Sequence, residues 1–233
     1  MTDALPIVLV PGLICSPRIW APLLPTLWRH GPVTVANHIR DDSMAAIARR
    51  ILKEAPPRFA LAGHSMGGYI AFEIMRQAPE RVAKLALLNT QARPDMPEAT
   101  ARRRSMVARA QGGGYRAVVD EFWTNFVHPS RGGDASLHQI VHEMADDVGV
   151  EAFVRQQSAN MARPDSRPTL TAIRCPTLVL TCDTDNTVPP KLSPEMADGI
   201  AGSWLVVLEN CGHLPQLERP EATAEALVEW LTA

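Results

Sequence analysis

Short apolar runs rich in branched residues alternate along this chain with longer stretches of helical periodicity. Strands buried on both faces of a parallel sheet have such continuous apolar runs, and crossover helices occupy the intervals between them. Strands are expected at 7–10, 33–36, 59–62, 85–88, 177–181 and 205–208, and helices at 18–29, 43–54, 66–77, 192–200 and 220–231. The pattern predicts an α/β fold with a mainly parallel six-stranded sheet flanked by helices.

One interval, from residue 91 to residue 174, is too long for an unstructured loop in a compact domain. Its periodicity is largely helical, and glycine runs break it into shorter pieces. Helices are expected there at 98–110, 115–125, 136–146 and 150–161. We therefore expect a helical cap, 91–174, inserted into a core made of residues 1–90 and 175–233.

Charge and composition narrow the class of partner. The chain has 23 basic and 25 acidic residues, so no strong field attracts nucleic acid or an anionic membrane. No basic leader opens the chain, and no apolar stretch approaches the ~20 residues that span a bilayer. The four cysteines form no CxxC pair, so reduced thiols are expected. We expect a cytoplasmic monomer or homodimer that acts on a small molecule, with no nucleic-acid or membrane partner.

Gly63 and Gly67 bracket Ser65 between a predicted strand and a predicted helix. This G-x-S-x-G pattern is typical of a nucleophile elbow, a sharp strand-to-helix turn that exposes a serine hydroxyl. The turn strains the serine backbone, and side chains two positions away would collide with it. The motif also occurs by chance in glycine-bearing loops, but its position after a strand favours a nucleophile. The adjacent His64 is expected to point away and to be structural.

A serine hydroxyl needs a base within hydrogen-bond reach and an acid that orients the base. His213 and Asp185 each follow a predicted strand, so both should reach Ser65 at the carboxyl edge of the sheet, where open α/β sheets bind ligands. Asp183 follows the same strand as Asp185 and is the alternative acid. Cys211 lies two residues from His213, but its context as a nucleophile is far weaker than that of Ser65.

With these motifs the chain resembles the α/β-hydrolase family over essentially its whole length. The resemblance rests on the elbow, on C-x-x-D-x-x-x-P ending at Pro189, and on G-H-x-x-x-x-E-x-P ending at Pro220. Relatives usually have glycine where this chain has Cys182. The resemblance implies an α/β-hydrolase fold with an inserted helical cap, and the spacing to Pro189 favours Asp185 over Asp183 as the acid.

The same resemblance implies an oxyanion hole made by two backbone N–H groups. Met66, directly after the nucleophile, supplies one, and Leu13, in the loop after the first strand, is the candidate for the other. That loop contains Pro-Gly where relatives often have His-Gly, so a bracing histidine is missing. In the cap, Trp123 and Phe153 are expected to line an apolar acyl pocket, although most aromatic residues at helical spacing belong to the core.

Two other patterns in the cap favour ordinary helix surfaces. His138 and His142 lie four apart on a predicted helix, but H-x-x-x-H-E is not the H-E-x-x-H of zinc proteases, so we expect no metal. Residues 102–104 are three arginines, which we expect to be solvated. The alternative is that one or two of them bind an acidic substrate or an acyl-carrier partner.

Together these residues predict a serine hydrolase that cleaves a small-molecule carboxylic ester or lactone through an acyl-enzyme, without metal or organic cofactor. Within the family the resemblance is to carboxylesterases, 3-oxoadipate enol-lactonases and pimeloyl-carrier-protein methyl esterases. C–C bond hydrolysis and perhydrolysis on the same triad are alternative reactions. A non-catalytic ligand receptor is an alternative of a different class, which an intact Ser65, Asp185 and His213 disfavour.

Overall fold

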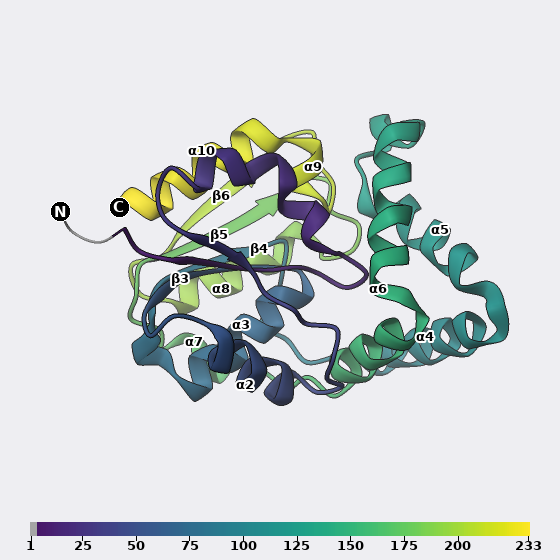
Figure 1. The fold of residues 1–233 in the computed structure, drawn as a ribbon, viewed down its shortest axis with the longest axis horizontal. Helices are drawn as coiled ribbons and strands as arrows, with labels where there is room; N and C mark the ends of the chain where they lie inside the picture. Colours follow the sequence, from purple (N-terminus) through teal and green to yellow (C-terminus); the bar gives the residue numbers. More distant parts are fainter. Residues whose placement is uncertain (1–3) are drawn as a thin grey trace.

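The computed structural model in Figure 1 describes residues 4–233. Six strands form one sheet in the order β2-β1-β3-β4-β5-β6, and all neighbouring pairs are parallel. The strands are β1 (Ile7–Val10), β2 (Val33–Val35), β3 (Phe59–His64), β4 (Val82–Leu88), β5 (Thr177–Cys182) and β6 (Trp204–Leu208). The predicted strands and their parallel sheet are therefore confirmed.

Helices cover both faces of this sheet, which is why β1, β3 and β5 are buried at every position. On one face lie α2 (Met44–Glu54), α3 (Met66–Gln77) and α8 (Ser193–Gly199), and on the other α1 (Leu24–Leu27) and α10 (Pro220–Thr232) (Figure 1). The short helices η2 (Pro79–Arg81) and α9 (Pro215–Glu218) precede β4 and α10. The helices on both faces bury the apolar strands. Residues that bind ligands or catalyse reactions in such a sheet lie at the carboxyl ends of its strands.

Two predicted helices differ in type from the structure. The predicted helix 18–29 is instead a 3-10 helix, η1 (Pro17–Leu23), followed by the single turn α1. Pro22 lies inside η1 and Pro25 at the start of α1, and each removes a backbone donor that a continuous α-helix needs. The segment 192–200 likewise starts as the 3-10 turn η5 (Pro190–Leu192) before α8.

The segment 97–161, between β4 and β5, is largely helical and lies beyond the carboxyl ends of the strands (Figure 1). It contains α4 (Pro97–Arg109), the π-helical turn η3 (Ala110–Gly114), α5 (Tyr115–Phe126), η4 (Pro129–Arg131) and α6 (Ala135–Met161). Gly149, with φ 74° and ψ 165°, kinks α6, so the helices predicted at 136–146 and 150–161 are its two arms. We call α4, α5 and α6 the cap helices.

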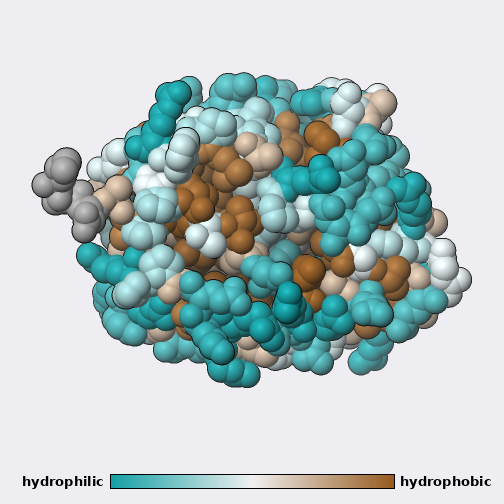
Figure 2. Space-filling model, in the orientation of Figure 1, coloured by the Kyte–Doolittle hydropathy of each residue, from teal (hydrophilic) through white to brown (hydrophobic). Residues whose placement is uncertain are grey.

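The last turn of the predicted cap range, α7 (Arg167–Leu170), packs against α3 and α8 on the core. Leu170 is buried there, and a Cβ at Gly199 would lie 2.8 Å from its Cδ1, so glycine allows α8 to approach. The face in Figure 2 is mostly hydrophilic, with hydrophobic residues showing over the N-terminal strands. Within residues 4–233, none of the helices combines the length and the apolar composition that crossing a membrane requires.

Candidate active site

Ser65 sits in a strained turn between β3 and α3, with φ 53° and ψ −114°. Space at this turn explains the two glycines. A Cβ at Gly63 would lie 2.3 Å from the carbonyl oxygen of Gly67, and a Cβ at Gly67 would lie 2.2 Å from the carbonyl oxygen of Val10. The close packing that excludes side chains at these positions also holds the serine in its unfavourable conformation.

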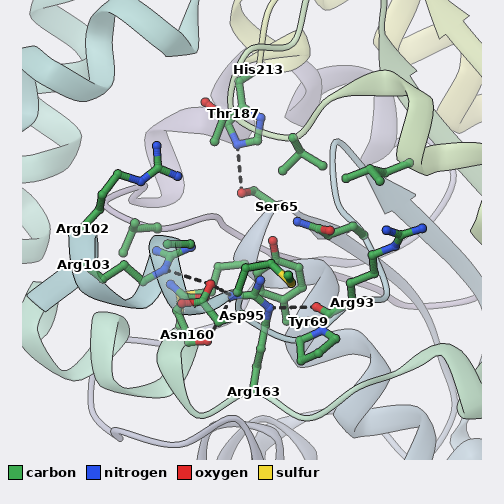
Figure 3. A pocket seen from close by; sticks show the side chains of 18 of the residues that line it. Ser65, Tyr69, Arg93, Asp95, Arg102, Arg103, Asn160, Arg163, Thr187 and His213 are labelled. Carbon is green, nitrogen blue, oxygen red and sulfur yellow. Dashed lines mark hydrogen bonds and ion pairs between the residues drawn. The ribbon is translucent and has the colours of Figure 1, made fainter.

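Ser65, His213 and Asp185 form a continuous hydrogen-bonded chain. The Ser65 Oγ lies 2.9 Å from His213 Nε2, a contact drawn in Figure 3, and His213 Nδ1 lies 2.7 Å from Asp185 Oδ2. A carboxylate only accepts, so it favours the tautomer with the proton on Nδ1, which leaves Nε2 to accept the serine proton. The structure thus brings together the three residues singled out in the sequence.

The environment of Asp185 keeps its carboxyl ionised. Its Oδ1 accepts the backbone N–H groups of Thr187 and Val188 over 2.8 and 2.9 Å. Burial by itself would raise the pKa of Asp185, but the charge and hydrogen bond of His213 and the other donors outweigh burial and lower it. The carboxylate is therefore fixed in both position and charge.

Asn89, at the end of β4, is a member of the site that the sequence analysis did not assign. Its Nδ2 donates to Asp185 Oδ2 over 2.8 Å, and its backbone has a φ of 45°. The Cys182 thiol donates to Asn89 Oδ1 over 3.6 Å. Cys182, which stands where relatives usually have glycine, therefore helps to orient the amide that contacts the acid. The sequence did contain a signal for Asn89, because a polar residue directly after a buried strand is a candidate for a site at the sheet edge.

The alternative acid, Asp183, is occupied elsewhere. Its carboxylate accepts the backbone N–H groups of Asn210 and Cys211, and no hydrogen bond joins it to His213 in the described part of the chain. His64 is fully buried, and its Nε2 donates to the carbonyl oxygen of His213 over 2.8 Å. Burial lowers the pKa of His64 to about 3, so its ring is neutral and braces the histidine loop.

The loop after β1 presents the backbone N–H of Leu13 without a hydrogen-bond partner among residues 4–233. On one side of it the Gly12 carbonyl accepts from His38 Nε2 over 2.9 Å, and on the other the Ile14 N–H donates to Gln156 Oε1 over 3.1 Å. Ile14 has a φ of 53°, which is costly for a β-branched residue. His38 and Gln156, neither of them singled out in the sequence, thus hold the strained loop in place.

Glu218 ties the histidine loop to the cap. Its buried carboxylate accepts the backbone N–H groups of Gly212 and Leu214 in the loop and of His128 after α5, at 2.9, 3.4 and 2.7 Å. Burial raises the pKa of Glu218, and the three donors oppose that rise. This glutamate is the one in the G-H-x-x-x-x-E-x-P motif. Its three contacts explain why a glutamate is needed at this position of the motif.

A cavity of about 330 Å³ is bordered by Ser65, His213 and both predicted oxyanion residues, Leu13 and Met66. Met66 opens α3, where the first backbone N–H groups lack partners within the helix. Ser65, His213, Leu13 and Met66 therefore border one space, where acyl transfer would need a nucleophile, a base and two backbone N–H donors.

The two aromatic residues predicted to line an acyl pocket do not border this cavity. Trp123 packs edge-on against His138 and donates from Nε1 to the Gly132 carbonyl. Phe153 is fully buried and packs against Tyr115. The aromatic lining comes instead from Phe122 and Phe126 on α5 and from Tyr69 on α3.

The cavity wall opposite the serine is rich in arginine. Figure 3 shows Arg103 and Arg163 converging on Asp95, with N–O distances of 3.3 and 2.6 Å. Arg93 is paired with Glu195 at the protein surface. Arg102 also lines the cavity, and its side chain makes no hydrogen bond or ion pair with any residue from 4 to 233. Asp95 balances only one of Arg103 and Arg163, and Arg102 has no acidic partner among residues 4–233, so the wall carries an excess of two positive charges.

Several known proteins are similar to this chain in sequence or in fold. A thermophilic esterase from Thermogutta terrifontis, solved with malate bound, is 30% identical and has a TM-score of 0.90 over 99% of this chain and 90% of its own. A 2-hydroxy-6-oxononadienedioate hydrolase of Escherichia coli is 26% identical, covering 88% of this chain and 73% of the relative. A pimeloyl-acyl-carrier-protein methyl ester esterase of Neisseria meningitidis is 26% identical, covering 87% and 82%.

The family model described as the alpha/beta hydrolase family matches residues 7–226. That range contains all six strands and every residue of the serine, histidine and aspartate arrangement. The chain therefore belongs to the alpha/beta hydrolase family.

Proposed function

We propose that this chain is a serine hydrolase that cleaves a carboxylic ester or lactone of a small molecule through an acyl-enzyme intermediate. The observation that carries the proposal is the hydrogen-bonded chain from Ser65 Oγ through His213 to Asp185 beside a cavity. An activated serine next to unpaired backbone donors is suited to attack on a carbonyl carbon.

In the proposed mechanism, Ser65 Oγ attacks the carbonyl carbon of the substrate as His213 Nε2 takes the serine proton. Asp185 holds the Nδ1–H and stabilises the imidazolium that forms. The backbone N–H groups of Leu13 and Met66 donate to the substrate oxygen and stabilise the negative charge that forms on it. His213 then protonates the leaving alcohol, and a water activated by the same nitrogen hydrolyses the acyl-enzyme.

The uncompensated charge of Arg102 points to a substrate that carries a carboxylate. Charge-assisted hydrogen bonds between guanidinium and carboxylate are stronger than neutral ones, and Arg102 lines the cavity that holds Ser65. The name of the Escherichia coli relative describes a dicarboxylate substrate. We infer that the substrate places an apolar part against Phe122 and Phe126 near Ser65. Its carboxylate would lie at the arginine wall of the cavity.

Hydrolysis of a C–C bond beside a carbonyl is the second candidate, favoured by that same relative. It would use the same serine, histidine and aspartate, so the site alone does not separate the two reactions. A panel of activated esters, lactones and vinylogous 1,5-diketones separates them by the product that appears.

The test of the ester proposal uses two matched substrates: the mono-p-nitrophenyl ester of adipic acid, and the same ester with the second carboxyl converted to a primary amide. We expect the acid to be preferred. Arg102→Gln should raise KM for the acid ~10-fold, which is the lower range for a charged hydrogen bond, and leave the amide unchanged. Arg104→Gln, the same charge change on the same helix outside the cavity, is the control.

Two outcomes count against the proposal in different ways. Equal loss on acid and amide in Arg102→Gln would remove the acidic-substrate assignment and leave the esterase in place. Failure of wild type to cleave any ester or lactone in the panel, while C–C cleavage of a diketone proceeds, would replace the ester proposal with the second candidate.

A further inference from the structure

Three metal-ligand atoms converge on the face between α5 and α6, away from the cavity that holds Ser65. His138 and His142 lie one turn apart on α6, and Asp120 reaches them from α5. The Asp120 Oδ1 is 3.2 Å from His138 Nε2 and 2.9 Å from His142 Nε2, and the two Nε2 atoms are 3.2 Å apart.

Hydrogen bonds alone do not satisfy this triangle. A neutral imidazole carries one N–H, so if both Nε2 atoms donate to Asp120, the contact between the two nitrogens joins two donors. If one Nε2 is instead an acceptor, its contact with the Asp120 carboxylate joins two acceptors. Protonating both rings restores two donors at 3.2 Å and adds repulsion between two positive charges. While Asp120 is ionised, at least one of the three contacts is therefore unfavourable in every protonation state of the two rings.

A cation between the three atoms makes all three contacts favourable, because each atom then offers a lone pair. With bonds of 2.0–2.2 Å, neighbouring ligand atoms of a tetrahedral zinc ion lie roughly 3.3 Å apart. The observed sides of 2.9, 3.2 and 3.2 Å are close to that spacing. The side chains of Asp120 and His138 are 55% and 37% exposed, so an ion could enter and keep a water as fourth ligand.

We propose that Asp120, His138 and His142 bind one divalent transition-metal ion, with Zn²⁺ as the prototype. Two imidazoles and one carboxylate suit ions of this class and not Mg²⁺ or Ca²⁺, which prefer oxygen ligands. The ion links α5 to α6 and so stabilises the cap. None of the three residues borders the cavity with Ser65, and the site is structural, with no part in the chemistry of that serine.

The residues around the three ligands affect the affinity of the site for a metal ion. A ligating histidine usually donates its other ring N–H to an outer partner, and loss of such a partner costs 10–100-fold in metal affinity. His142 Nδ1 is buried and has no partner among residues 4–233. Trp123 packs edge-on against His138, with ring centroids 4.9 Å apart, and limits the motion of that ring. We therefore expect a weaker site than a structural zinc finger.

The test measures binding of ZnCl₂ to chelator-treated protein by calorimetry and its effect on thermal unfolding. We expect one Zn²⁺ per chain and, at a hundredfold excess of free Zn²⁺ over Kd, a Tm rise of roughly 5–10 °C. MgCl₂ should leave Tm unchanged. Co²⁺ should give the visible absorption of a tetrahedral site. Labelling of Ser65 by a fluorophosphonate should be the same with and without metal.

Asp120→Asn, His138→Gln and His142→Gln should each weaken Zn²⁺ binding at least tenfold and remove most of the Tm rise. His30→Gln, a histidine outside the cluster, is the control and should bind like wild type. The metal-free Tm of each variant shows that it folds. Equal Zn²⁺ affinity in wild type, Asp120→Asn and His142→Gln, or no Tm response in a folded wild type, would overturn the proposal.

Discussion

The backbone N–H of His213 donates to the carbonyl oxygen of Phe126 over 2.6 Å, so helix α5 of the cap ends directly on the loop that carries the histidine. Gly212 makes this approach possible. A Cβ at Gly212 would lie 2.6 Å from His128 N and 2.8 Å from Phe126 O. The position of the cap and the position of the proposed base are therefore mechanically linked.

Gly212→Ala should break this link. The methyl group must displace either the cap backbone or the histidine loop, because both atoms that it would meet belong to backbone. We expect a loss of at least tenfold in kcat together with a Tm lower by several degrees, from an overpacking cost of ~1–3 kcal/mol. Gly133→Ala, in the cap with open space around it, is the control. Wild-type kcat in a folded Gly212→Ala protein would refute the link.

Asp185→Asn tests the proposed acid. An asparagine amide keeps the shape but favours the wrong tautomer of His213, and in the serine-protease template this change lowers kcat by ~10⁴. Asp183→Asn should keep most of the activity, because the Asp183 carboxylate accepts from Thr184 and from the turn before His213 and not from His213 itself. Initial rates with an activated ester, measured on variants that unfold cooperatively, decide between them. A larger loss in Asp183→Asn would move the acid to that residue.

Gln156→Leu tests whether the loop with Leu13 needs its brace. The change removes the acceptor for the Ile14 N–H, and a buried N–H without a partner costs ~1–3 kcal/mol. A displaced loop should lower kcat ~10–100-fold, somewhat less than the ~10²–10³ for complete loss of one oxyanion donor, with KM nearly unchanged. Affinity for a boronic acid, whose tetrahedral adduct needs the same donors, should fall by the same factor.

Gln139→Leu lies on the exposed side of the same helix and is the control for this test. If Gln156→Leu lowered Tm but left kcat and boronic-acid affinity at wild-type values, Gln156 would be a packing residue only.

Acid stability should depend on Asp95. Its ion pair with Arg163 has side chains that are 1% and 4% exposed. Burial alone would raise the pKa of Asp95, but Arg103 and Arg163 outweigh it and hold the pKa below its ordinary value. Such a carboxylate stabilises the fold above its unfolded pKa, near 4, and this stabilisation is lost as pH falls through the lower folded pKa.

Asp95→Asn should therefore lower the free energy of unfolding at pH 7 by ~3–5 kcal/mol, since it leaves Arg163 buried without its partner. It should also flatten the decline of stability below pH 4. Urea unfolding between pH 3 and pH 7 measures both effects. Asp165→Asn, which breaks an exposed pair with Arg167, should cost under ~1 kcal/mol. Equal costs for the two variants would show that burial of the Asp95 pair contributes nothing.

Local rules explain what the sequence could predict. Branched apolar runs indicated the strands, and the G-x-S-x-G pattern indicated the turn at Ser65, because both are patterns of residues that are neighbours in the chain. The predicted helix 18–29 was wrong in type because Pro22 and Pro25 outweighed its apolar periodicity.

Contacts made across the fold were not predictable in this way. Phe122 and Phe126, four apart, share one face of α5 and border the cavity, whereas Trp123 is turned by about 100° and packs on α6. Asn89 reaches Asp185, and Gln156 reaches Ile14, only once distant segments are packed together. No local sequence pattern predicts the strand order that places β4 beside β5. The same is true of the kink that sets the direction of α6.

The central claim is that Ser65 is an activated nucleophile, and covalent labelling tests it most directly. Wild-type protein treated with a fluorophosphonate should gain the mass of one adduct, located at Ser65 by peptide mapping, at a rate that falls in His213→Gln because the base is removed. Ser65→Ala should gain no adduct under the same conditions. An unmodified wild-type protein, or an adduct that persists in Ser65→Ala, would contradict the account.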